Sequence, residues 1–245
     1  MHPWAPNLFS FQMTRDPAFQ FEPGQFARIG VRRDTGDPDS PESIVWRAYS
    51  VVSPKNAPYL EFFSIVIPGG AFTPALARQR AGSTIYLEQL SYGFLTLARF
   101  EPARDLWMLC TGTGLAPFLS ILGEPGTWNH YQNLVVVHSV RYPNELAYAE
   151  TLRAAAGAPR SAMLHYVPVV TRRETPGALS QRIPALLENG ILEKRVGLQI
   201  DPTHSRVLVC GNPEMIKATR KVLASRGLAP SRRGNPGQLA VENYW

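Results

Sequence analysis

A short glycine-rich segment separates a β-type run from a helical pattern. The apolar residues 106–110 lead into Gly112, Thr113 and Gly114, and Pro117 stands where the helical pattern starts. Glycine lets a backbone turn tightly and approach a diphosphate, and proline suits the first helical turn, where its missing N–H costs nothing. The segment indicates a dinucleotide diphosphate site, although a tight turn in any α/β protein uses similar residues.

Arginines follow the next predicted strands. The second strand ends at Val140 and Arg141, the third at Thr171 and Arg172, and Arg182 comes ten residues later. An NAD site usually places an acidic residue on the ribose 2′-hydroxyl, and no acid ends the second strand. Several arginines at neighbouring strand ends favour the 2′-phosphate of NADP, while the alternative is that they are solvated surface side chains.

Two cysteines limit the redox chemistry of the chain. Cys110 and Cys210 are too few for an iron–sulfur cluster or a structural zinc site, so we expect an organic redox cofactor, no metal, and two free thiols. Cys210 precedes Gly211 and Asn212 at the end of a predicted strand, where a nicotinamide would lie. The alternative is a small buried residue before a tight turn.

A third group of polar residues lies in the first half of the chain. On a strand, Arg47 and Tyr49 share one face, and Ser50 points to the other. Arginine pairs with phosphates, tyrosine offers a flat surface, and serine offers a hydrogen bond. The trio suits an aromatic cofactor that carries phosphates, although the same alternation is common in half-exposed strands.

These groups need two kinds of framework. Short β-rich segments at residues 25–31, 43–52, 59–67 and 84–88 predict antiparallel strands of a small barrel or sandwich. After residue 100, predicted strands at 106–110, 134–140, 163–170 and 207–210 alternate with predicted helices at 116–122, 144–156, 179–188 and 214–226. This alternation is typical of a parallel sheet covered by helices. We therefore expect two domains, an antiparallel β-barrel at residues 1–100 and an α/β domain at residues 101–245.

Composition narrows the class of protein. The 245 residues are 44% hydrophobic and 18% charged, and no apolar run is long enough to span a membrane. We expect no secretory signal and a cytoplasmic location. The net charge of +6 allows an anionic partner. A basic nucleic-acid-binding module is disfavoured because the arginines lie at strand ends and form no basic stripe interleaved with aromatic residues.

The ordered set of motifs resembles the ferredoxin–NADP reductase family. The residues that carry the resemblance are Arg47-x-Tyr49-Ser50, then Gly112-Thr113-Gly114-x-Ala116-Pro117, then Cys210-Gly211-Asn212-Pro213, in this order. The chain is most similar to the bacterial ferredoxin/flavodoxin–NADP reductases that end in Tyr-Trp. The resemblance extends over essentially the whole chain.

The resemblance implies an FAD-binding barrel joined to an NADP-binding domain. The FAD contacts that it implies are Arg47, Ala48, Tyr49, Ser50, Ser64, Ala71, Phe72, Thr73, Thr113, Tyr244 and Trp245. The NADP contacts that it implies are Gly112, Thr113, Gly114, Val140, Arg141, Thr171, Arg172, Arg182, Cys210, Gly211 and Asn212. Ser50, Tyr49, Tyr244, Glu242 and Cys210 would surround the reacting rings, while the alternative for Glu242 is an exposed charge on a carboxyl-terminal strand.

The expected activity follows from this resemblance. An NADPH-dependent flavoenzyme would exchange a hydride between NADP(H) and FAD and pass single electrons to or from an acidic ferredoxin or flavodoxin. The same fold also suits a reductase of free flavin, quinone or another small acceptor. We expect a monomer. Relatives carry a further strand before residue 4, so we expect the barrel to lack its first strand or the chain to start upstream.

Overall fold

The computed structural model describes residues 1–32 and 43–243, so Tyr244 and Trp245 lie outside the described residues. The strands are β1 (His2–Ala5), β2 (Leu8–Thr14), β3 (Phe26–Arg32), β4 (Ile44–Ser50), β5 (Tyr59–Ile65), β6 (Tyr86–Tyr92), β7 (Asp105–Thr111), β8 (Asn133–Val140), β9 (Met163–Val170), β10 (Ser205–Gly211) and β11 (Leu239–Asn243). The helices are α1 (Thr73–Ala77), α2 (Ala116–Leu122), α3 (Pro125–His130), α4 (Ala149–Gly157), α5 (Ile183–Glu188), α6 (Ile191–Val196) and α7 (Pro213–Ser225). Short 3-10 turns are η2 (Leu97–Arg99), η3 (Gly112–Leu115) and η4 (Pro143–Glu145).

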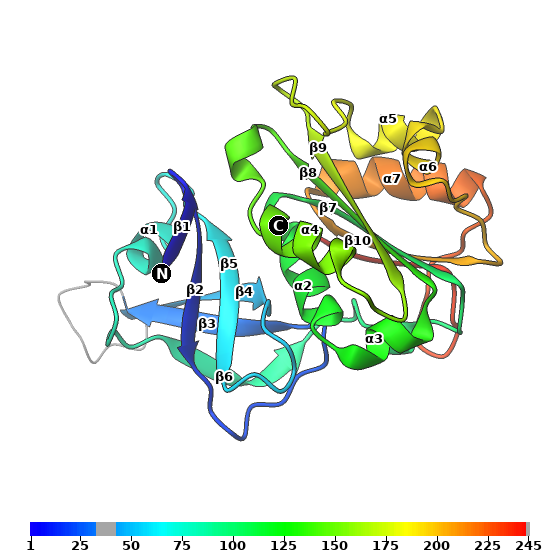
Figure 1. Cartoon of the computed structure of the whole chain (residues 1–245). Coiled ribbons are helices and arrows are strands. Elements are labelled where there is room, and N and C mark those ends of the chain that lie inside the picture. Colours follow the sequence, from blue (N-terminus) through cyan, green and yellow to red (C-terminus); the bar gives the residue numbers. More distant parts are fainter. Residues whose placement is uncertain (33–42, 244–245) are drawn as a thin grey trace.

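The first half consists of two three-stranded antiparallel sheets, ordered β1-β2-β5 and β4-β3-β6. Their inward side chains, among them Phe11, Ile29 and Phe62, pack in one hydrophobic cluster. Because side chains alternate across a strand, burying one face of each sheet leaves the other face for polar residues. This is the expected antiparallel framework (Figure 1).

The second half is a five-stranded parallel sheet in the order β11-β10-β7-β8-β9. The central strand β7 is buried on both faces: Leu106 and Met108 belong to one core cluster, and Trp107 and Leu109 to the other. Helices α2, α3 and α4 cover one face and α5, α6 and α7 the other, as Figure 1 shows. The prediction of an α/β domain is confirmed.

One core cluster spans both halves. Phe63 of the barrel and Phe118 of α2 belong to the same buried group. Polar contacts reinforce the junction, because the Ser120 hydroxyl donates to the Ser53 carbonyl oxygen at 2.8 Å and the Lys55 backbone N–H donates to Glu124 Oε1 at 2.7 Å. The barrel and the α/β sheet are therefore packed directly on each other.

Several predicted bounds were wrong. The helix expected at 144–156 is divided into η4 and α4, because Tyr148 has a left-handed backbone with φ 57°. The helix expected at 179–188 begins only at Ile183, because Leu179 pairs with Val169 at the edge of the sheet. The strand expected at 84–88 runs from Tyr86 to Tyr92.

The amino-terminal strand and the helices bear on two further expectations. β1 forms the edge of its sheet and pairs with β2 alone, and the expectation of a missing barrel strand stays a prediction. Across residues 1–32 and 43–243, no helix combines the length and apolar character that a membrane crossing needs.

Candidate functional site

A pocket of about 220 Å³ opens where the barrel meets the glycine-rich loop of the α/β domain. Its lining comes from β4, β5, the segment leading into α1, and one residue of the other half, Thr113. The lining residues are Arg47, Ala48, Tyr49, Phe63, Ser64, Ile65, Ile67, Gly70, Ala71, Phe72, Thr73 and Thr113. The pocket therefore combines barrel strands with the loop predicted to approach a diphosphate.

Tyr49 is held firmly in the pocket wall. Its hydroxyl lies 3.0 Å from the Ser64 hydroxyl, and its ring is 5.6 Å from the Phe72 ring, centroid to centroid. Burial raises the pKa of the Tyr49 phenol, so the ring is neutral at ordinary pH. A fixed, neutral aromatic ring offers a flat surface for a planar cofactor.

Polar groups stand beside this ring. Arg47 is exposed, and its guanidinium donates to the Trp46 carbonyl oxygen at 2.7 Å, which leaves further N–H groups of the same fork for a phosphate. The Thr73 hydroxyl oxygen accepts the Ile67 backbone N–H at 2.8 Å, so the hydroxyl hydrogen is not used in that bond. A flat wall with an arginine and a hydroxyl fits a flavin nucleotide.

Two loops from neighbouring strands interlock beside the pocket. Gly112 has φ +53°, a conformation that other residues adopt at a cost, and a Cβ at Gly114 would lie 2.5 Å from the Cys210 carbonyl oxygen. The Thr111 hydroxyl oxygen accepts the Asn212 backbone N–H at 2.8 Å. The Gly112–Leu115 turn and the residues that follow β10 therefore form one compact unit.

The second loop leads into α7, the longest helix described. Asn212 caps this helix, because its side-chain oxygen accepts the backbone N–H groups of Glu214 and Met215. Pro213 takes the first helical turn. The cap fixes the direction of the chain after Cys210 and Gly211.

Ser50, Glu242 and Cys210 meet at the junction of the two halves. The Ser50 hydroxyl donates to Glu242 Oε1 at 3.3 Å, and Glu242 pairs in register with Cys210 on the adjacent parallel strand. Burial raises the pKa of the Glu242 carboxyl to about 7, and the Ser50 hydrogen bond opposes that shift. Glu242 is therefore a partly buried acid poised near neutrality, which differs from the alternative of an exposed charge.

The two cysteines are buried, free thiols. Burial raises the pKa of both, and the Glu242 carboxylate raises that of Cys210 further. A protonated thiol is a poor nucleophile. Cys210 is thus suited to packing and contact at the site.

The buried His138 ring contacts the backbone of the glycine-rich loop. Its Nε2 lies 3.1 Å from the Gly112 carbonyl oxygen, and since a carbonyl only accepts, Nε2 carries the proton. Burial lowers the pKa of His138 to about 4, so the ring is neutral. The sequence analysis missed His138 and Thr111 as residues that fix the loops. The available signal was that each residue lies near the end of a strand, beside a loop of the site.

The structure brings two of the three expected arginines together. The Arg172 backbone N–H donates to the Arg141 carbonyl oxygen at 3.0 Å, and Thr171 bonds Val140 through both its backbone N–H and its hydroxyl. Arg182 is exposed and directly precedes α5. Among the described residues, no side-chain hydrogen bond joins it to Arg141 or Arg172. The roles of all three arginines stay predictions.

Glu145 is a further residue that the sequence analysis missed. Its carboxylate accepts from the Arg141 guanidinium at 3.0 Å and from the backbone N–H groups of Arg141 and Tyr142. The i to i+4 spacing of Arg141 and Glu145 was a signal for an ion pair. Glu145 orients the arginine without using its whole donor fork.

Comparisons with known proteins agree with this geometry. The family model described as "Oxidoreductase NAD-binding domain" matches residues 108–221. Ferredoxin–NADP reductase A of Sorangium cellulosum is 38% identical, and the match covers 99% of this chain and 86% of that protein. Ferredoxin–NADP reductase of Pseudomonas aeruginosa is 37% identical, with 99% and 93% covered.

A solved structure extends the likeness to three dimensions. The ferredoxin NADP+ reductase of Neisseria gonorrhoeae, crystallised with bound FAD and NADP, has a TM-score of 0.91 and 38% sequence identity, and the match covers 99% of this chain and 94% of that one. Sequence and structure agree over nearly the full length of both proteins. The chain belongs to the ferredoxin–NADP reductase family.

Proposed function

We propose that this protein is an NADPH-dependent FAD enzyme that exchanges a hydride between NADP(H) and FAD and passes single electrons to or from ferredoxin or flavodoxin. The observation that carries the proposal is the pocket between the halves, which Thr113 of the glycine-rich loop lines together with Tyr49 and Ser64 of the barrel. Such a junction lets a flavin and a nicotinamide share one site. The division proposed is an FAD domain at residues 1–100 and an NADP domain at residues 101–245.

Each side of the pocket has its own task. The barrel side would hold FAD through Arg47, Ala48, Tyr49, Ser50, Ser64, Ala71, Phe72 and Thr73, and Tyr244 and Trp245 would complete the aromatic surroundings. The other side would hold NADP(H) through Gly112, Thr113, Gly114, Val140, Arg141, Thr171, Arg172, Arg182, Cys210, Gly211 and Asn212. Arginine forks recognise phosphates by charged hydrogen bonds, which favours NADP over NAD.

When bound, FAD supplies the exchange between two-electron and one-electron chemistry. The protein side chains position the rings and set the charge around them. Thr113 contributes the lining of the pocket from the α/β half. Glu242 holds or releases a proton at its carboxyl near neutral pH, within reach of the Ser50 hydroxyl. Cys210 adds a neutral, polarisable surface beside Glu242.

We propose a separate protein as the electron carrier, because the two cysteines are too few to hold an iron–sulfur cluster. The net charge of +6 suits an acidic ferredoxin or flavodoxin through electrostatic steering. We also propose a monomer in the cytoplasm, where the two buried thiols stay reduced.

Acceptor assays test the function. The purified protein should be yellow with about one FAD per chain, and NADPH should drive reduction of a ferredoxin or flavodoxin more efficiently than of free FMN or a quinone. A colourless protein that takes up no added FAD contradicts the flavoenzyme. Efficient reduction of small acceptors alone would favour the second activity on the same fold.

A further inference from the structure

Tyr148 has an unusual backbone conformation. Its φ of 57° makes it the one non-glycine residue with positive φ in the described part of the chain. For a bulky side chain this conformation is energetically unfavourable and persists only when surrounding contacts hold it. The contacts that hold Tyr148 therefore indicate what the residue does.

The Tyr148 side chain is buried against the barrel although its backbone belongs to the α/β half. Its hydroxyl donates to Glu61 Oε1 at 2.6 Å. Its ring lies 4.5 Å from the Trp4 ring and meets the Phe63 ring edge-on at 5.4 Å, centroid to centroid. Burial raises the pKa of the phenol, so the hydroxyl keeps its proton and stays a donor.

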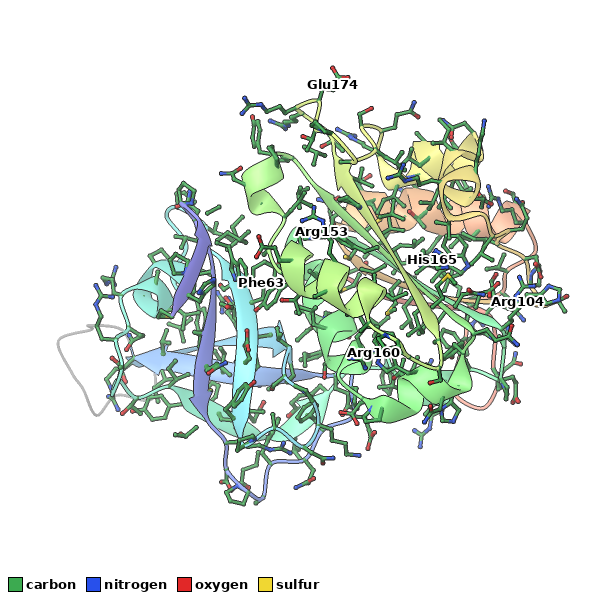
Figure 2. The ribbon with its side chains drawn as sticks, viewed as in Figure 1. Phe63, Arg104, Arg153, Arg160, His165 and Glu174 are labelled. Carbon is green, nitrogen blue, oxygen red and sulfur yellow. The ribbon has the colours of Figure 1, made fainter. Side chains whose placement is uncertain are left out.

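Glu61 and Trp4 are themselves fixed in the barrel. Gln12 donates to the other Glu61 carboxylate oxygen at 3.1 Å, and the Trp4 indole N–H donates to the Ser10 hydroxyl at 3.2 Å. Phe63 faces the α/β half from β5, as Figure 2 shows, and it also lines the pocket proposed for FAD. Tyr148 therefore contacts a residue that lines that pocket.

Tyr148 also ends the segment that carries Arg141. Within residues 141–147, Glu145 binds the Arg141 backbone and guanidinium, and the Ala147 backbone N–H donates to the Glu145 carbonyl oxygen at 2.8 Å. The Tyr148 carbonyl oxygen then accepts the Leu152 N–H and starts α4. One end of this segment follows β8, and the other is fixed to the barrel by Tyr148.

We infer that Tyr148 is a positioning residue that holds segment 141–147 against the wall of the flavin pocket and thereby places Arg141 for the 2′-phosphate of NADPH. The inference rests on the proposed function, since it needs a flavin on one side of Phe63 and a 2′-phosphate near Arg141. The proposed connection between the two cofactor sites has three steps. The Phe63 ring contacts the Tyr148 ring, the backbone leads from Tyr148 back to Glu145, and Glu145 binds Arg141.

Replacement of Tyr148 by phenylalanine is the test. Tyr148→Phe removes the donor to Glu61 and keeps the ring contacts. Tyr166→Phe is the matched control, because the Tyr166 hydroxyl is buried in the same half and has no hydrogen-bond partner among the described residues. Each holoenzyme is assayed with NADPH and NADH, with ferricyanide as electron acceptor, and its flavin absorbance and FAD content are measured.

The expected result is a change in nucleotide selectivity. Tyr148→Phe should raise the KM for NADPH about fivefold or more, leave the KM for NADH within about twofold, and leave FAD content and the flavin spectrum unchanged. Tyr166→Phe should match the wild-type protein. Glu61→Leu removes the same acceptor, and that of Gln12 as well, and should reproduce the effect. The double variant should be no worse than the stronger single one, because both changes break the Tyr148–Glu61 hydrogen bond.

Two results would overturn the inference, and they are distinguishable. If the wild-type enzyme prefers NADPH but Tyr148→Phe leaves its selectivity intact or weakens both nucleotides equally, Tyr148 is structural and the proposed function stands. If the wild-type enzyme uses both nucleotides equally, the proposed choice of NADP is wrong, and the Tyr148 assignment is wrong with it.

Discussion

Arg172 is the residue through which the choice of nucleotide is most simply tested. Its backbone is bonded to that of Arg141, so the two side chains leave neighbouring loops at the same edge of the sheet. Loss of a charged hydrogen bond costs roughly 1.5–3 kcal/mol, so Arg172→Ala should raise the KM for NADPH about 10- to 150-fold with little effect on NADH.

The neighbouring Arg173 supplies the control for that measurement. It is also exposed and carries the same charge, so Arg173→Ala removes one positive charge without removing the predicted contact. Steady-state kinetics with both nucleotides compare the two variants. Equal losses for Arg172→Ala and Arg173→Ala would mean that only overall charge matters at this edge.

Glu242 predicts a pH dependence of stability. Its folded-state pKa of about 7 exceeds its ordinary value of 4.5, so the folded protein binds this proton more tightly than the unfolded chain. The bound proton contributes fully to the free energy of unfolding below pH 4.5. That contribution, at most roughly 3 kcal/mol, is lost as the pH rises to about 7. Glu242→Gln should flatten this part of the stability curve.

Denaturant unfolding between pH 5 and about 8 measures that effect. Glu150→Gln, at an exposed position of α4, is the control and should leave the curve as in the wild-type protein. If Glu242→Gln and Glu150→Gln give the same pH dependence as the wild-type chain, Glu242 is not the raised carboxyl.

Between elements, the contact of the two loops depends on Gly114. A Cβ there would overlap the Cys210 carbonyl oxygen at 2.5 Å, so Gly114→Ala should push the loops apart. Overpacking of this kind costs about 1–3 kcal/mol, and the KM for both nucleotides should rise because the diphosphate loop moves.

Gly157→Ala is the matched control, since among the described residues no atom beyond its chain neighbours and its own helix backbone lies within 4 Å of a Cβ at that position. Thermal unfolding and nucleotide kinetics of the two variants are compared. If Gly114→Ala has the same thermal stability and the same KM for both nucleotides as Gly157→Ala, the close contact between the two loops is not needed.

The sequence predicted the elements whose pattern is local and periodic. Residues 116–122 and 163–170 are a helix and a strand with the predicted bounds, because apolar periodicity and Pro117 act over a few neighbouring residues. The six-residue helices α3 and α6 were missed, and the equally short α5 was predicted with a start at residue 179 in place of Ile183. Leu179 was misplaced because its pairing with Val169 is a contact between distant segments.

The same distinction applies to the site. Gly114 and Cys210 could be named from sequence because turns and strand ends gather at one edge of an α/β sheet. Tyr49 could be named because it alternates with Arg47 on one face of a predicted barrel strand. The Ser50–Glu242 hydrogen bond joins residues far apart in the chain, and only the packing of the two halves brings them together. Glu145 and Tyr148 were missed for a similar reason, since their roles depend on the path of an irregular segment.

For the whole molecule, the net charge of +6 predicts a salt-dependent encounter with the electron carrier. Electrostatic steering is screened over about 10 Å at 0.1 M salt, so the rate of ferredoxin or flavodoxin reduction should fall severalfold between low and moderate ionic strength. Reduction of an uncharged quinone, followed in the same buffers, corrects for effects of salt on the flavin and nucleotide sites. An acidic carrier whose reduction rate is unchanged by salt would argue against steering.

The junction of the two halves is the basis of the whole account, because Thr113 of one half lines the same pocket as Tyr49 and Ser64 of the other. The most direct measurement is an anaerobic titration of the purified protein with NADPH, followed by the visible absorbance of the flavin. The account predicts a yellow protein whose flavin absorbance is bleached by about one equivalent of NADPH and far more slowly by NADH. A colourless protein, or a bound flavin that NADPH does not bleach, would contradict it.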